Sequence, residues 1–161
     1  MTPLIIMLSV FVLYVGHVWI FHGVQKSISY SFYLLPDRWG WIFTVFCVGI
    51  SLPAIYLASS NPEHLWIISF SAAGIIFAGA ASHYEKKPGR YNPIQGRPVH
   101  MIGSYVGVLG SQLYMGLNGF WGFNIAFVVF ALVLFKHKNF IWWLEVMAFG
   151  LLALYLSNGI L

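Results

Sequence analysis

Three ionisable side chains in this sequence are of the types that bind metals and carry out hydrolysis. His83 and His100 stand on either side of the polar stretch between two apolar segments, and Glu145 lies inside the last apolar segment. Neutral imidazole and carboxylate are good zinc ligands, and catalytic zinc keeps three protein ligands and a water. These residues are our candidates for metal binding and for catalysis in a metal-dependent hydrolase of a lipid ester or amide. The spacings HxxxH, HExxH and CxxC are absent from the sequence, so no familiar motif supports a metal site.

A larger group of polar side chains favours ligand binding. Hydroxyl groups crowd together in "SISYSFY", and His17 lies about 7.5 Å further along its apolar segment than His22, at the rise per residue of a helix. Ionisable groups inside apolar segments are costly and tend to mark function. The residues that we expect to line one polar pocket are Ser27, Ser29, Tyr30, Tyr33, His17, His100 and Glu145. We favour a pocket for a lipid head group or a small polar molecule.

Apolar helices are the elements that must position these residues. Of the 161 residues, 60% are hydrophobic and 7% are charged, whereas about a quarter of a soluble domain is charged. A helix needs ~20 mostly apolar residues to cross a hydrocarbon core of about 30 Å. The apolar segments cover residues 2–21, 41–58, 65–81, 101–117, 120–135 and 140–161. The sequence therefore predicts an all-α membrane protein, a six-transmembrane-helix bundle that forms a single domain over residues 1–161.

The positive charges predict how this bundle is oriented. Every Lys and Arg falls in the first, third or fifth connection between apolar segments: Lys26, Arg38, Lys86, Lys87, Arg90, Arg97, Lys136 and Lys138. Cytoplasmic loops carry an excess of these residues. We expect a multi-pass protein of the cell inner membrane with both termini outside, in the periplasm. The net charge of +4 is then explained by the topology of the connections, and it does not indicate a nucleic-acid partner. The basic connections would attract anionic membrane lipids.

The first connection is more than a linker in this interpretation. Val24, Ile28, Phe32 and Leu35 recur at three- or four-residue spacing, which is typical of an amphipathic helix on the membrane surface. The opposite face would carry Ser27, Tyr30 and Ser31. Two interpretations stay open, a plain surface helix and a lid over the cytoplasmic pocket.

Small residues predict where helices pack closely. Gly103, Gly107 and Ser111 recur every four residues, and glycines and alanines are frequent in residues 72–81. Small residues at this spacing let two backbones approach each other in lipid. We expect a tight hairpin between the third and fourth helices. The alternative is that the Gly103/Gly107/Ser111 face forms a homo-oligomer, with a structural role for the protein.

Three stretches carry a resemblance to known proteins. "SISYSFYLLP", "AGIIFAGAA" and "VHMIGSYVGVLGSQL" resemble a group of small polytopic membrane proteins of bacteria and phages that has no established activity. The matching residues are Ser27, Ser29, Tyr33, Pro36, Gly74, Gly79, His100, Gly103 and Gly107. This resemblance implies a shared fold for the first four helices. The chain is also loosely similar to the ceramidase-like membrane hydrolases, which implies zinc chemistry near one membrane face, although their HxxxH motif is missing here.

Overall fold

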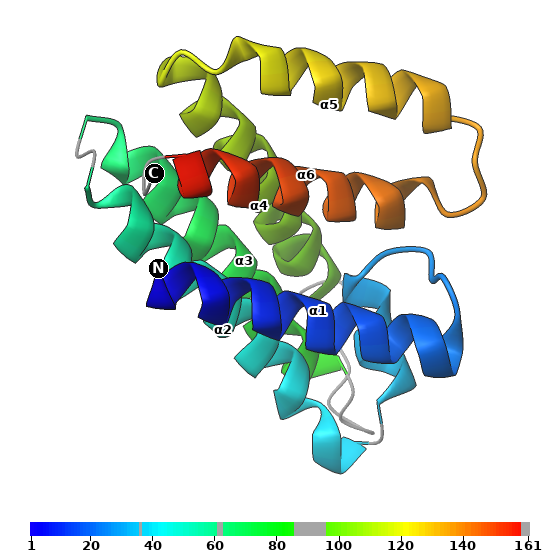
Figure 1. Ribbon diagram of the computed structural model, residues 1–161. Helices are drawn as coiled ribbons and strands as arrows, with labels where there is room; N and C mark the ends of the chain where they lie inside the picture. Colours follow the sequence, from blue (N-terminus) through cyan, green and yellow to red (C-terminus); the bar gives the residue numbers. More distant parts are fainter. Residues whose placement is uncertain (36, 61–62, 86–95, 159–161) are drawn as a thin grey trace.

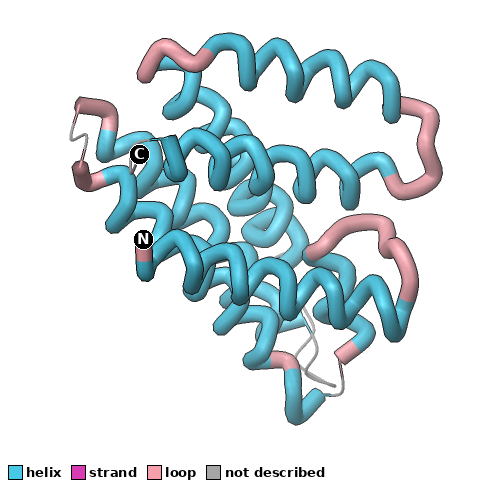
Figure 2. The backbone as a smooth tube through the Cα atoms, in the orientation of Figure 1, coloured by secondary structure: helices cyan, strands magenta, loops and turns pink. Residues whose placement is uncertain are grey.

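A computed structural model describes residues 1–35, 37–60, 63–85 and 96–158, with the side chains of all of these except 37, 82–85 and 96–98. Helices account for almost all of the described backbone, and short loops join them (Figure 2). The elements, in order, are α1 (Thr2–His22), η1 (Ser29–Leu34), η2 (Asp37–Trp39), α2 (Trp41–Ala58), α3 (Leu65–Glu85), α4 (Gly96–Leu117), α5 (Trp121–Leu134) and α6 (Phe140–Asn158). The prediction of an all-helical protein is confirmed for this part of the chain.

The helices begin and end close to the predicted positions, with one systematic difference. The α2 helix has the predicted bounds, whereas α3 continues past residue 81 to Glu85 and α4 begins at Gly96 and not at residue 101. Hydropathy follows the apolar side chains, while a helix is continued by its backbone hydrogen bonds. Polar residues can therefore extend a helix beyond its apolar segment. The last predicted segment, 140–161, includes three residues that lie outside the described part.

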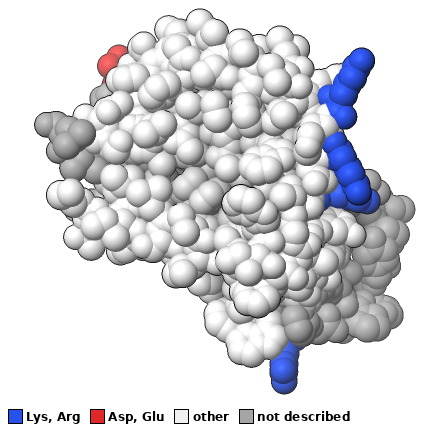
Figure 3. Space-filling model, turned by 45° about the vertical axis from the view of Figure 1, so that its right-hand side comes forward, with Lys and Arg blue, Asp and Glu red and all other residues white. Residues whose placement is uncertain are grey.

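Three of the described helices, α1, α2 and α6, are long and apolar enough to cross a membrane. The apolar part of α3 and the whole of α5 are shorter. Large apolar side chains are exposed along the bundle, among them Ile20 (78%), Val133 (76%) and Leu132 (73%). In the view of Figure 3 a broad uncharged face separates the Lys and Arg side chains from the acidic atoms at the opposite edge. An apolar surface of this extent is consistent with a membrane protein.

The most extensive pairing is the α3–α4 hairpin, in which glycines bring the two backbones together. A Cβ atom added to Gly103 would lie 2.5 Å from the carbonyl oxygen of Gly74, and one added to Gly74 would lie 2.7 Å from that of Gly103. Gly107 instead leaves room for the Ile75 side chain, because a Cβ atom added to Gly107 would lie 2.5 Å from the Ile75 Cγ1 atom. A side chain at Gly74, Gly103 or Gly107 would therefore not fit without a shift of its neighbour. The predicted tight hairpin is confirmed.

The remaining helices surround this hairpin unequally. The α6 helix contacts α1, α2, α4 and α5, whereas α5 contacts α4 and α6 and has no buried residue. Figure 1 shows α5 at the margin of the bundle, beside α6. The N-terminus and the carboxyl end of α6 lie at the end of the bundle where α2 connects to α3. The α1–α2 and α5–α6 connections lie at the other end, which we call the basic end because they carry Lys26, Arg38, Lys136 and Lys138.

The α1–α2 connection is folded, but not as the predicted amphipathic α-helix. Gly23 ends α1 with a φ of 72°, a conformation that favours glycine, and the chain then forms the two 3₁₀-helices η1 and η2. A 3₁₀-helix has three residues per turn, so residues i and i+3 share a side. Ile28 and Ser31 are accordingly buried on one side, together with Phe32. Ser31 thus belongs to the buried side of this segment and not to its polar face.

Candidate functional site

A cavity of about 110 Å³ lies between α1, α2, α3, α4 and α6. Three of these helices contribute a stripe of residues at positions i, i+3, i+4 and i+7, which is the spacing of one helix face. The stripes are Phe43, Phe46, Cys47 and Ile50 on α2; Ser104, Gly107, Val108 and Ser111 on α4; and Glu145, Ala148, Phe149 and Leu152 on α6. The glycine-mediated approach of α3 and α4 leaves the serines of α4 facing this space. The cavity is thus built by the ordinary geometry of helix packing.

The Glu145 carboxylate is held by the start of η1. Its Oε2 atom accepts a hydrogen bond of 2.5 Å from the backbone N–H of Ile28, and the backbone N–H of Ser29 also bonds to the carboxylate. These N–H groups are among those that a helix leaves without a partner in its first turn, and they favour a negative charge. Ile28 and Ser29 also line the cavity. The α1–α2 connection therefore closes one side of the cavity, at the carboxylate.

Further hydrogen bonds fix this connection to the bundle. The buried hydroxyl of Ser31 lies 2.7 Å from the Tyr14 hydroxyl of α1 and also donates to the carbonyl of Ile28. The side-chain amide of Asn139 donates to the carbonyl of Val24 at 3.2 Å. Helices α1 and α6 and the α5–α6 connection thus all hold the segment in place. The segment is a structured part of the site.

Aromatic rings form much of the cavity wall. Phe11 of α1 and Phe149 of α6 stack with their ring centroids 3.7 Å apart and their planes 3° from parallel. Phe43 and Phe46 of α2 lie with their centroids 6.0 Å apart. Phe46 also stacks on Tyr14, at 4.3 Å. The carboxylate of Glu145 therefore faces a space with largely apolar and aromatic walls.

Of the residues that we expected to line one pocket, Ser29 and Glu145 do line this cavity. Ser27 lies beside them, where its hydroxyl contacts that of Ser29 at 2.9 Å and accepts a hydrogen bond from the backbone N–H of Tyr30. Tyr30 and Tyr33 lie outside the cavity, with 38% and 47% of their surface exposed. The three-residue turns of η1 point both rings outward, and their centroids lie 5.6 Å apart.

The predicted histidines do not meet at the carboxylate in the described part of the chain. His17 is exposed on α1, where its ring lies 4.7 Å from that of Phe21. The Nδ1 atom of His100 lies 3.0 Å from the carbonyl oxygen of Ala78, so this side chain links α4 to α3. The side chain of His83 is outside the described residues. Among the described residues, no group of three or more His, Cys, Asp and Glu side chains is placed to hold a metal ion.

The face expected to form a homo-oligomer is covered within the chain. Gly103 and Gly107 contact α3 directly, and Ser111 is 4% exposed and lines the cavity. The backbone carbonyl of Gly107 also accepts a hydrogen bond of 2.5 Å from Ser71 of α3. Association with another copy through this face stays a prediction. The structure assigns the same residues to the α3–α4 hairpin and to the cavity wall.

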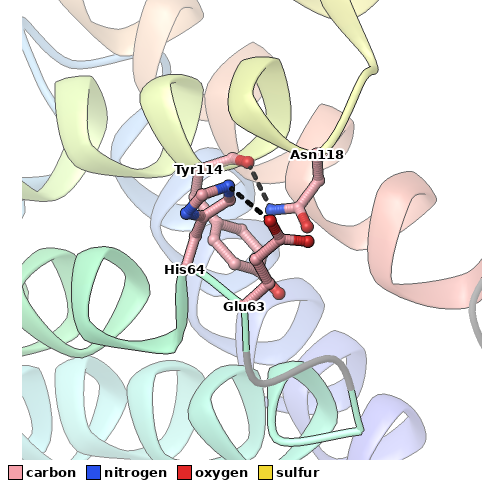
Figure 4. A network of polar contacts seen from close by, with 4 residues as sticks. All are labelled: Glu63, His64, Tyr114 and Asn118. Carbon is pink, nitrogen blue, oxygen red and sulfur yellow. Dashed lines mark hydrogen bonds and ion pairs between the residues drawn. The ribbon is translucent and has the colours of Figure 1, made fainter.

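The opposite end of the bundle has a smaller set of polar contacts. There the imidazole of His64 lies 4.0 Å from the carboxylate of Glu63, and Asn118 donates a 2.7 Å hydrogen bond to the backbone carbonyl of Tyr114 (Figure 4). Glu63 is 79% exposed. Exposed ion pairs contribute little to stability. We therefore place the candidate site at the cavity and not at this end.

Several residues of the site have no distinctive signal in the sequence. Tyr14, Cys47, Ser104 and the cavity phenylalanines stand at ordinary helical spacing in uniformly apolar segments. Their stripes resemble those of a filled helix interface, because both follow the same period. The spacing of Glu145, Ala148, Phe149 and Leu152 is the one signal that ties a stripe to a charged residue. Comparisons with protein-family models, with curated proteins and with solved structures found no match for this chain.

Proposed function

We propose that this protein is a multi-pass protein of the inner membrane, with six spanning helices and both termini outside. The apolar surface supports the membrane location, and the Lys and Arg side chains of the basic end support an orientation with that end in the cytoplasm (Figure 3). The shorter α5 and the apolar part of α3 would cross as members of hairpins, α3 with α4 and α5 with α6. Their neighbours would supply the anchoring at the interfaces.

Labelling of single cysteines tests this topology. In a Cys47→Ala background, Gln95→Cys and Asn118→Cys place one thiol in the third and one in the fourth connection. A membrane-impermeant maleimide added to intact cells should label position 118, and it should label position 95 only after the inner membrane is opened. Labelling of position 95 from outside would contradict the orientation.

We propose that the central cavity binds a lipid head group or a small polar molecule. The observation that carries this proposal is the Glu145 carboxylate, which faces a cavity of about 110 Å³ beside Ser29. An apolar cavity of about 150 Å³ in another protein holds benzene, so this one suits a group of roughly five non-hydrogen atoms. A buried carboxylate in a membrane bundle is costly and marks a functional site by default. Glu145, Ser29 and Ser104 would contact the polar part of the ligand.

A cavity-filling substitution tests this binding function. Ser104→Leu places a larger apolar side chain in the cavity and leaves Glu145 itself unchanged. Native mass spectrometry of the purified wild type should show a bound lipid or small molecule, and Ser104→Leu should lose most of this species. Ser157→Leu is the matched control, because the Ser157 hydroxyl donates to the nearby carbonyl of Leu154 and Ser157 is not among the described residues that line the cavity. Equal occupancy in both variants would contradict the proposal.

A further inference from the structure

The chemistry of the cavity restricts the class of ligand. Glu145 is the single charged side chain among the lining residues, and no Lys, Arg or His contributes to the described wall. Its partners there are the backbone N–H groups of Ile28 and Ser29, which carry partial charges only. A lone carboxylate in an apolar site attracts a positive charge much more strongly than it would in water. An anionic ligand would meet this charge with no cation to offset it.

The aromatic walls favour the same sign of charge. Phe11, Phe43, Phe46 and Phe149 line the cavity from α1, α2 and α6. The face of an aromatic ring carries negative potential and attracts cations, and cages of such rings recognise ammonium groups with several alkyl substituents. A small metal ion would instead require several oxygen ligands in place of these rings. The walls suit a cation that is large, weakly hydrated and covered by alkyl groups.

We infer that the cavity binds a small organic ammonium group, with its nitrogen beside Glu145 and its alkyl groups against the phenylalanine rings. This inference rests on the proposed binding function and names the chemistry of its ligand. A trimethylammonium group is within the size that the cavity accepts. Such a group occurs in free quaternary ammonium compounds and in the head groups of phospholipids, and the two sources share the chemistry that the site recognises.

Two probes of the same shape test the inference in the wild-type chain. Choline and 3,3-dimethylbutan-1-ol differ mainly in one atom, a positive nitrogen in the first and a neutral carbon in the second. Calorimetry on the full chain in a nonionic maltoside detergent should give at least tenfold tighter binding of choline. Competition between the probes, and weaker binding of both to Ser104→Leu, would place them in the cavity.

Two substitutions then assign the preference to named side chains. Glu145→Gln keeps an oxygen acceptor for η1 but removes the charge, so the two probes should bind with similar affinity. Phe46→Leu should weaken choline binding severalfold and the neutral alcohol less. Phe77→Leu is the matched control, because Phe77 is 62% exposed on α3 and does not line the cavity. Wild-type protein alone still decides the question if a variant does not fold.

The source of the ammonium group is read from two further measurements. In nanodiscs of phosphatidylglycerol, binding of free choline would identify a free quaternary ammonium compound as the ligand. In native mass spectra, retention of phosphatidylcholine over phosphatidylglycerol would identify a lipid head group. Equal binding of choline and the neutral alcohol, together with equal retention of the two lipids, would overturn the inference while leaving the binding function in place. A cavity that retains neither probe nor lipid would contradict both.

Discussion

Two contacts between helices in this protein are made in opposite ways. The glycine seam lies between α3 and α4, with backbone against backbone at Gly74 and Gly103, and with Gly107 and Gly110 packed against side chains of α3. The polar seam, formed by Glu145 with Ile28 and Ser29 and by Tyr14 with Ser31, holds a connection against α6 and α1 by hydrogen bonds. The first depends on shape and the second on polar partners that another molecule can replace.

The two seams therefore differ in how easily they can move: the glycine seam fixes the positions of α3 and α4, whereas the polar seam can adjust when a ligand binds. Close contacts between backbones in lipid are maintained by dispersion forces and cannot adjust without moving a whole helix. A hydrogen-bonded segment outside the long helices opens at a lower free energy than the core. We therefore expect the cavity wall on the α3–α4 side to be fixed, and the wall at η1 to adjust when a ligand reaches the carboxylate.

The glycine seam should give the largest effect on stability. Gly103→Ala places a methyl group against the Gly74 carbonyl, at 2.5 Å before any adjustment. Overpacking of this kind costs up to about 3 kcal/mol of unfolding free energy. Gly16→Ala is the control, because a Cβ atom there meets nothing within 4 Å. Denaturation in detergent should show a large loss for Gly103→Ala and none for Gly16→Ala, whereas equal effects would mean that this contact does not limit packing.

Removal of the carboxylate should give an intermediate effect that is confined to the polar seam. Glu145→Ala leaves the N–H groups of Ile28 and Ser29 without their acceptor, which costs about 2 kcal/mol when such groups stay buried. Hydrogen exchange at these two amides should become faster, while exchange in α3 and α4 stays the same. If exchange accelerates evenly in all helices, the two seams are not independent.

Loss of one hydroxyl at the same seam should give the smallest effect. Tyr14→Phe removes the contact with Ser31 and keeps the ring that stacks on Phe46. Hydrogen bonds between membrane helices contribute about 0.6 kcal/mol on average. Tyr30→Phe is the matched control, since Tyr30 is exposed. A shift in the denaturation midpoint for Tyr14→Phe that equals the control would show that this bond adds nothing to the seam.

The helices themselves were readable from the sequence, because a spanning segment is defined by its length of apolar residues. The spacing of Gly103 and Gly107 also predicted the correct hairpin, since small residues every four positions have few other uses in lipid. The end of α3 was placed too early and the start of α4 too late, because hydropathy does not detect a helix that continues through polar residues. Composition thus predicts where helices lie, and less well where they stop.

The candidate site was predicted only at Glu145 and Ser29, and the reason lies in the helix surfaces. A membrane helix is apolar on the side toward lipid and on the side toward its neighbours, so its period does not show which stripe faces a cavity. His17 and Tyr14 stand three residues apart on α1, yet His17 is exposed and Tyr14 is buried. The 3₁₀ turns of η1 add a second difficulty, because an α-helical period places Ser31 on the polar face, whereas its side chain is buried.

The single thiol of the chain has a practical consequence for work on this protein. Cys47 is 2% exposed, has no disulfide partner and lines the cavity. A small alkylating reagent must therefore enter the cavity before it reaches the sulfur, so the rate of alkylation reports how often the space is open and empty. Alkylation of the native Cys47 can therefore measure ligand occupancy in intact membranes, without an engineered cysteine.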